Sequence, residues 1–112
     1  MSQLTTHILD TTKGKPAQGI YITLYYLKKE EWVVITNGIT NTDGRIPDLV
    51  KKEVLMELGT YKLRFETRPY FIQQAVQTFY PFIEIVFEVT TAEHYHVPLL
   101  LNPFGYSTYR GS

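Results

Sequence analysis

Alternation of apolar and polar residues with a period of two constrains this sequence more than any other feature. In one segment Tyr61, Leu63 and Phe65 alternate with charged residues, and in another the apolar set predicted to be buried is Ile83, Ile85, Phe87 and Val89. This spacing is typical of a β-strand with one buried face and one wet face. Residues 20–27 and 32–36 are rich in β-branched and aromatic residues, and the polar residues 28–31 between them predict a hairpin loop.

Turn signals separate these predicted strands. Residues 11–19 and 41–47 contain the glycine and proline residues that punctuate short strands. Six or seven strands at this spacing predict an all-β fold, an antiparallel β-sandwich.

Two segments follow a different pattern. Residues 47–59, PDLVKKEVLMELG, begin near a proline, carry apolar residues at helical spacing and end on a glycine, so the pattern predicts a helix. Residues 68–77, RPYFIQQAVQ, also begin near a proline and place Phe71 and Ala75 on one side. They are the second predicted helix.

Size and composition limit the classes of function. With 112 residues, 44% of them hydrophobic, the chain is expected to form one domain, residues 1–112. Eleven basic residues balance eleven acidic ones, so no overall field attracts nucleic acid or an anionic membrane. The chain has no cysteine, which excludes disulfides and thiolate chemistry. Residues 1–10 do not resemble a secretory signal, and we expect a soluble, cytoplasmic protein.

The residues that could carry chemistry are concentrated near the C-terminus. In the predicted last strand, Tyr95, Val97, Leu99 and Leu101 form the natural core face, so His94 and His96 point outward. Three interpretations are open: ordinary surface histidines, a metal site completed by His7, or acid–base groups that work near neutral pH.

Two arginines are also candidates. Arg45 follows a predicted turn, and Arg110 lies two residues from the chain end. Each is either a solvated loop residue or a planar set of donors that holds a carbonyl or an anion. The sequence lacks a nucleophile-elbow serine, a phosphate-binding glycine loop and a recognisable pair of glycosidase carboxylates.

Four features, in this order, resemble the 5-hydroxyisourate hydrolases, the transthyretin-related enzymes of urate breakdown. They are THILDTTKGKPAQG (residues 6–19), TDGR (residues 42–45), HYHVPLLLNPFGYSTYRGS (residues 94–112) and, within it, the terminal YRGS. The final tetrapeptide is the most specific, because in that family it separates the enzymes from transthyretin, the hormone carrier with the same fold.

The resemblance implies a set of site residues. The family's catalytic positions fall on His7, Arg45 and His96. The substrate-binding positions fall on the tail and on a neighbouring histidine: Tyr109, Arg110, Gly111, Ser112 and His94. The resemblance implies no metal and no cofactor.

The resemblance also implies a fold, an activity and an assembly. The fold would be a transthyretin-like sandwich of about seven or eight strands, with one short helix near residues 69–77 and a loop at residues 47–58. The activity would be hydrolysis of 5-hydroxyisourate to 2-oxo-4-hydroxy-4-carboxy-5-ureidoimidazoline, with sites at a subunit interface of a homotetramer. The alternatives are a transthyretin-like ligand carrier and an interaction sandwich with a histidine metal patch.

Overall fold

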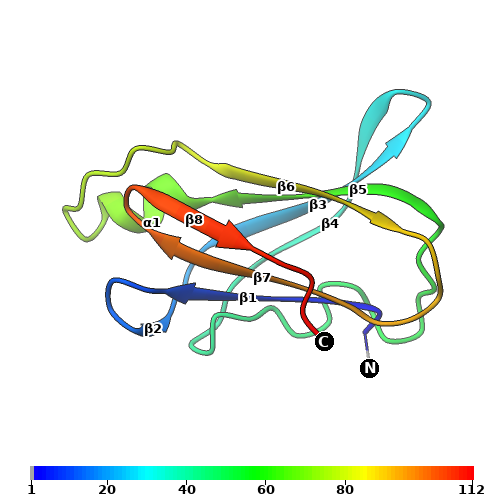
Figure 1. Ribbon diagram of the computed structural model, residues 1–112, viewed down its shortest axis with the longest axis horizontal. Helices are drawn as coiled ribbons and strands as arrows, with labels where there is room; N and C mark the ends of the chain where they lie inside the picture. Colours follow the sequence, from blue (N-terminus) through cyan, green and yellow to red (C-terminus); the bar gives the residue numbers. More distant parts are fainter. Residues whose placement is uncertain (1) are drawn as a thin grey trace.

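Two four-stranded sheets form the molecule in the computed structural model, which describes residues 2–112 (Figure 1). One sheet has the order β2-β1-β7-β8 and the other β4-β3-β5-β6. The strands of this described part are β1 (Leu4–Asp10), β2 (Lys15–Pro16), β3 (Tyr21–Lys28), β4 (Glu31–Ile39), β5 (Gly59–Glu66), β6 (Ile83–Val89), β7 (Tyr95–Asn102) and β8 (Gly105–Thr108). The predicted β-sandwich is confirmed.

The sheet of β2-β1-β7-β8 is not purely antiparallel. β1 and β7 run parallel, with Leu4 opposite Tyr95 and Asp10 opposite Leu101. The other strand pairs are antiparallel. Parallel neighbours need a long connection, and here the chain between β1 and β7 supplies it by building the whole second sheet. The two ends of the chain therefore lie side by side.

The alternating apolar residues fill the space between the sheets, as the sequence predicts. The largest buried side chains include Phe65, Leu63 and Ile83 from one sheet and Leu4, Ile8 and Leu99 from the other. Each fully buried side chain of this size contributes about 1.5–3 kcal/mol relative to exposure. The core thus fixes which face of β1 and β7 points outward.

The predicted helix at residues 47–59 is wrong. This segment forms turns and bends, and Asp48 has a φ of +59°. The exposed fractions of Val54, Leu55 and Leu58, on the presumed apolar side, are 46%, 71% and 62%. The segment instead buries Leu49, Val50 and Met56 over one end of the core. The loop implied by the family resemblance is the observed structure.

The second predicted helix exists with different bounds. α1 (Thr67–Ile72) begins before the expected residue 69 and ends well before residue 77. Pro69 lies in its first turn, where proline is tolerated, and Ala75, with a φ of +58°, lies beyond its end. Tyr70 on this helix donates a hydrogen bond from its hydroxyl to Oδ2 of the buried Asp10 at 2.7 Å. Across residues 2–112, no helix has the length and apolar character needed to cross a bilayer.

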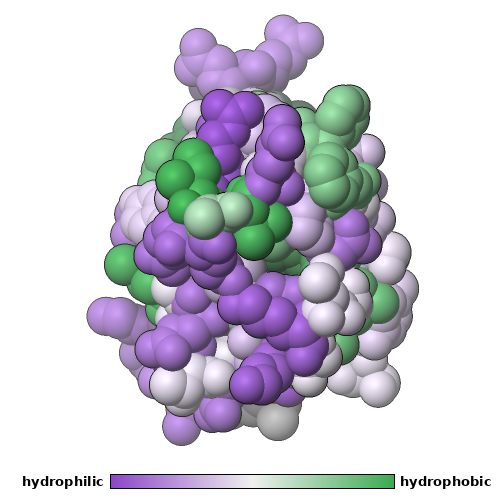
Figure 2. All heavy atoms as spheres, turned by 90° about the vertical axis from the view of Figure 1, so that its left-hand side faces the viewer, coloured by the Kyte–Doolittle hydropathy of each residue, from purple (hydrophilic) through white to green (hydrophobic). Residues whose placement is uncertain are grey.

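The end of the molecule that carries α1 has a mixed surface. Exposed apolar side chains there include Ile72, Phe79 and Phe104. Figure 2 faces this end and shows hydrophobic residues in small groups separated by hydrophilic ones. The candidate histidines His7 and His96 are on a different surface, the outer face of the sheet formed by β2, β1, β7 and β8.

Candidate active site on the outer face of a sheet

His7 and His96 lie on the outer face of two neighbouring strands. Along β1 and β7 the burial alternates, and both histidines occupy half-buried positions between core residues. In the parallel register His96 is opposite Thr5, and His7 is opposite Pro98. The two imidazoles are therefore offset by two residues on the same face, within reach of one bound molecule.

The turn at residues 41–45 brings Arg45 to the same strand. The amide of Ile8, next to His7, donates to the carbonyl oxygen of Gly44 at 3.0 Å. Gly44 has a φ of +71°, and a Cβ there would lie 2.5 Å from the carbonyl oxygen of Ile8, so this docking requires glycine. The Asn41 side chain stabilises the turn by accepting a hydrogen bond from the Arg45 amide at 3.1 Å. Arg45 itself is exposed.

Burial and Arg45 lower the pKa of both histidines. For His7, desolvation is the larger cause and the Arg45 charge the second, while the backbone and carboxylate of Asp43 act in the opposite direction. For His96, desolvation again comes first, followed by the charges of Arg45, His94 and His7. The charge of Arg45 acts on both imidazoles, which places the three groups in one electrostatic cluster. Both imidazoles are therefore neutral at neutral pH, the form that accepts a proton.

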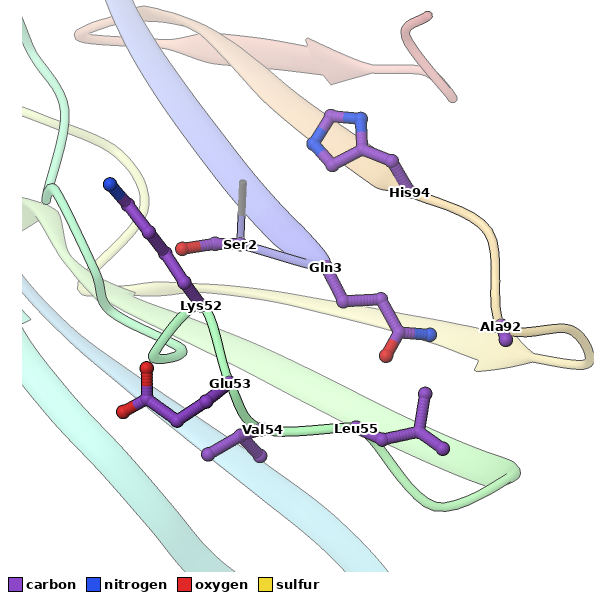
Figure 3. A pocket seen from close by; sticks show the side chains of 8 residues that line it. All are labelled: Ser2, Gln3, Lys52, Glu53, Val54, Leu55, Ala92 and His94. Carbon is purple, nitrogen blue, oxygen red and sulfur yellow. The ribbon is translucent and has the colours of Figure 1, made fainter.

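Thr5 joins His94 to His96. The hydroxyl oxygen of Thr5 lies 2.9 Å from Nε2 of His94 and 2.8 Å from Nδ1 of His96. The two imidazole rings are nearly parallel, with centroids 6.4 Å apart. His94 also lines a surface pocket of about 340 Å³, together with Lys52 and Glu53 across from it (Figure 3). His94 thus connects the histidine cluster to a solvent-filled depression.

The C-terminal tail passes directly beside His96. The amide of Gly111 donates to the carbonyl oxygen of His96 at 2.8 Å, which forms an isolated antiparallel bridge. Figure 1 shows the tail turning from β8 across the beginning of β7. The tail is therefore attached to the sheet at the candidate site.

Arg110 points to a different side from the histidines. Its guanidinium lies 4.5 Å from the ring centroid of Tyr95, a core-facing residue, and it donates to Oε1 of Glu93 at 2.5 Å. Tyr109 and Arg110 line a pocket of about 290 Å³ that also includes residues of β6. Arg110, one of the substrate-binding residues implied by the family resemblance, therefore lies away from the histidines in the single chain. Ser112, the last residue, is exposed.

The structure brings together most of the site residues expected from the sequence. His7, Arg45, His96 and His94 form one cluster, and Gly111 contacts it through His96. Sequence reasoning missed Thr5, which shares a strand face with His7 by the same period of two. That spacing was the available signal.

The cluster contains the groups that a hydrolytic reaction requires. Neutral imidazoles can take a proton from water, and an exposed guanidinium can stabilise a negatively charged oxygen. Within residues 2–112, no group of three or more histidine, aspartate or glutamate side chains is arranged to hold a metal ion.

Comparison with known proteins yields consistent matches. The model of the HIUase/Transthyretin family matches residues 4–111. A 5-hydroxyisourate hydrolase from Mus musculus is 45% identical over 114 residues, which cover 99% of this chain and 96% of the mouse protein. These matches cover almost the whole sequence.

Two solved structures show the same fold. Klebsiella pneumoniae 5-hydroxyisourate hydrolase has a TM-score of 0.84 and 35% identity, and the match covers 99% of this chain and 100% of that one. Sea bream transthyretin in complex with thyroxine has a TM-score of 0.91 and 30% identity, with 97% of this chain and 94% of that chain covered. The family resemblance and the transthyretin-like fold expected from the sequence are confirmed.

Proposed function

Because this chain belongs to the HIUase/Transthyretin family, we propose that it is a 5-hydroxyisourate hydrolase of urate breakdown. It would open the substrate ring by hydrolysis to give 2-oxo-4-hydroxy-4-carboxy-5-ureidoimidazoline. One observation supports the proposal: His7 and His96, which are far apart in the sequence, lie on one sheet face, and the charge of Arg45 from the neighbouring turn acts on both. The hydrolase names of the mouse and Klebsiella relatives support it.

We propose that His7 and His96 orient and activate the attacking water. Water is a poor nucleophile at neutral pH, and a positioned base removes its proton as the oxygen attacks a ring carbonyl. The lowered pKa of both imidazoles keeps them in the neutral form that this step needs. The protonated imidazole then returns a proton to the ring nitrogen as the carbon–nitrogen bond breaks.

Arg45 is assigned to the developing negative charge. The carbonyl oxygen becomes an oxyanion when the carbon turns tetrahedral, and a guanidinium already in place stabilises it. The docking of Gly44 on β1 supports this role, because it fixes where Arg45 leaves the turn. The same positive charge favours the neutral histidines.

The tail and a second subunit would complete the site. The histidine face of a single chain is only half-buried, and Gly111 anchors the tail at its edge. We propose a homotetramer, a dimer of dimers, in which this face meets another subunit and Tyr109 to Ser112 form part of the wall around the substrate. Closed two-fold symmetry would then produce sites in pairs. A cytoplasmic location stays a prediction.

A ligand carrier is the second candidate function. The close structural match to a transthyretin solved with thyroxine favours it. A carrier of this kind would bind an aromatic molecule without converting it. Equilibrium binding of an aromatic ligand, combined with no turnover in the assay described next, would support the carrier over the hydrolase.

The experiment that tests the proposal generates 5-hydroxyisourate in place from urate with urate oxidase. Its decay is followed by absorbance with and without this protein. We expect faster decay with the wild-type chain and a loss of about 10²–10⁴-fold in turnover for His96→Ala, the range for removing a general base. Glu31→Ala, an exposed position at the start of β4 on the other sheet, is the control and should keep activity. No acceleration by the folded wild-type protein would refute the proposal.

A further inference from the structure

The hydroxyl of Thr5 has two imidazole partners and one proton. It lies within hydrogen-bonding distance of Nδ1 of His96 and Nε2 of His94. A hydroxyl donates one hydrogen bond and accepts others. If both contacts are hydrogen bonds, at most one imidazole nitrogen can accept from Thr5, so at least one of the two must donate to it. When the hydroxyl hydrogen of Thr5 is donated to one of the two rings, the direction of these two hydrogen bonds fixes the tautomer of both neutral rings.

Catalysis by His96 requires one of the two directions. The hydrogen bond of its ring to Thr5 uses Nδ1, so the nitrogen left to take a proton from water is Nε2. A neutral imidazole with a free Nε2 carries its hydrogen on Nδ1 and donates it to Thr5. The hydroxyl hydrogen of Thr5 is then free to be donated to Nε2 of His94, which would act as the terminal acceptor.

We propose that His94, acting through Thr5, is the positioning residue that holds His96 in the tautomer with a free Nε2. This inference rests on the proposed hydrolase function, since it assigns a role to a group beside the base. It follows the general arrangement in which a third group orients a catalytic base. Here an imidazole and a hydroxyl take the place that a carboxylate often has.

The surroundings of His94 suit this role. Its ring borders the pocket of about 340 Å³, where Figure 3 shows it on one side and Lys52 and Glu53 on the other. Solvent in this pocket can hydrate the second ring nitrogen, so His94 can accept from Thr5 without leaving its Nδ1 hydrogen unpaired. Gln3, in the same pocket, links β1 to the neighbouring loops by donating to the Thr91 carbonyl oxygen and accepting from the Met56 amide.

The first test reads the tautomers directly, by NMR of ¹⁵N-labelled imidazole nitrogens at pH 8. In the wild-type protein we expect His96 and His94 both to carry hydrogen on Nδ1. In His94→Phe the acceptor is lost, so the Thr5 hydroxyl should turn to donate to His96 and shift it to the Nε2–H form. His96 in the Nε2–H form in the wild-type protein would overturn the proposal. This measurement does not depend on hydrolysis, so it separates a failure of this inference from a failure of the proposed function.

The second test compares kinetics in matched variants. We expect kcat to fall by about 10-fold to 100-fold in Thr5→Val, by analogy with the loss of a partner that orients a metal-bound imidazole, with a smaller change in KM. Thr5→Ser keeps the hydroxyl and should restore most of the rate. His94→Gln keeps an acceptor oxygen and should exceed His94→Phe in kcat.

The control variant is Thr11→Val. Thr11 follows β1 and donates a hydroxyl hydrogen bond to the Leu101 carbonyl oxygen, outside the histidine cluster. We expect near wild-type kcat there. Equal kcat in Thr5→Val and Thr5→Ser, or in His94→Phe and His94→Gln, with all four variants folded by circular dichroism, would overturn the proposal.

Discussion

Gly111 is pressed against His96 by both a hydrogen bond and a steric limit. Its amide donates to the His96 carbonyl oxygen at 2.8 Å, and a Cβ on Gly111 would lie 2.6 Å from Cδ2 of the imidazole. Cδ2 is bonded to Nε2, the nitrogen assigned to proton transfer. We therefore predict that Gly111→Ala displaces the ring or the tail and lowers kcat by at least about 10-fold, since small misplacements of reacting groups are costly.

Gly105→Ala is the matched control for this substitution. Gly105 lies in β8, and the nearest atoms to a Cβ there are 3.6 Å and 3.7 Å away, which is ordinary contact. Steady-state kinetics and thermal unfolding should show Gly111→Ala impaired in kcat with little loss of stability. Unchanged kcat in Gly111→Ala would show that the contact does not constrain the ring.

The pH dependence of activity should have its acid limb below the ordinary histidine pKa of about 6.5. Burial and Arg45 lower the pKa of His7 and His96, so both bases stay neutral through neutral pH. We expect kcat/KM to be flat near pH 7–8 and to fall only at lower pH. An acid limb centred above pH 6.5 would contradict this assignment.

The same lowered pKa values affect stability in a defined direction. The folded chain binds these protons less readily than the unfolded chain, so acid favours unfolding. Titration of His7 and His96 leaves the free energy of unfolding unchanged well above pH 6.5. As the pH falls below 6.5, it lowers this free energy progressively. Urea unfolding of the wild-type protein and of His7→Asn/His96→Asn between pH 5 and 8 should show a smaller acid loss in the double variant.

Two substitutions of Arg45 should distinguish the effect of its positive charge from the effect of its planar set of donors. Arg45→Lys keeps the positive charge but loses the planar donors, and we expect kcat to fall by about 10²–10³-fold, as for removal of an oxyanion-stabilising donor. Arg45→Gln removes a cause of the lowered pKa, so NMR titration should show the pKa of both His7 and His96 rising. Arg68→Lys, exposed on α1, is the control and should change neither quantity.

Removal of residues 109–112 should abolish turnover and preserve the fold. The tail contributes the Gly111 bridge to β7 and the contact of Arg110 with Glu93 and Tyr95, but none of the core side chains. Exposed ion pairs add little stability. Circular dichroism and thermal unfolding should resemble the full chain, and full activity in the shortened protein would refute a role for the tail.

The buried hydrogen bond between Tyr70 and Asp10 should matter for stability. Burial raises the pKa of Tyr70 to about 12, so it remains a donor to the Asp10 carboxyl group. Tyr70→Phe leaves one buried oxygen of Asp10 without this partner, and we expect a loss of about 1.5–3 kcal/mol in the free energy of unfolding. Tyr21→Phe, on an exposed side chain, should change it by less than about 0.5 kcal/mol. Equal losses in urea denaturation would contradict the prediction.

Periodicity predicted the strands well because burial of one face is a local property of the sequence. Leu63 and Phe65 on β5 are fully buried where the pattern placed them. The same reasoning gave the wrong structure for residues 47–59. Several apolar residues of this loop cover the end of a core made by other strands, whereas Leu55 stays exposed. The helical spacing of the apolar residues in this segment does not indicate which part of the core they pack against.

Only part of the site could be predicted, because local alternation shows to which side a residue points but not which residue of another strand lies beside it. The outward direction of His96 follows from the alternation in its own strand, but its pairing with Thr5 depends on the register between β1 and β7. The side to which Arg110 turns depends on Glu93 and the ring of Tyr95. Contacts between distant segments require the assembled sheet, and local patterns do not specify them.

The parallel pairing of β1 with β7 also dictates when activity can arise during protein synthesis. Until residues 95–101 have left the ribosome, β1 lacks the neighbour that it pairs with along its whole length. His7 then has no partner histidine beside it, and β1 is an unprotected edge that can pair with another chain. Enzymatic competence and protection against aggregation are therefore acquired together, once β7 is available to pair with β1.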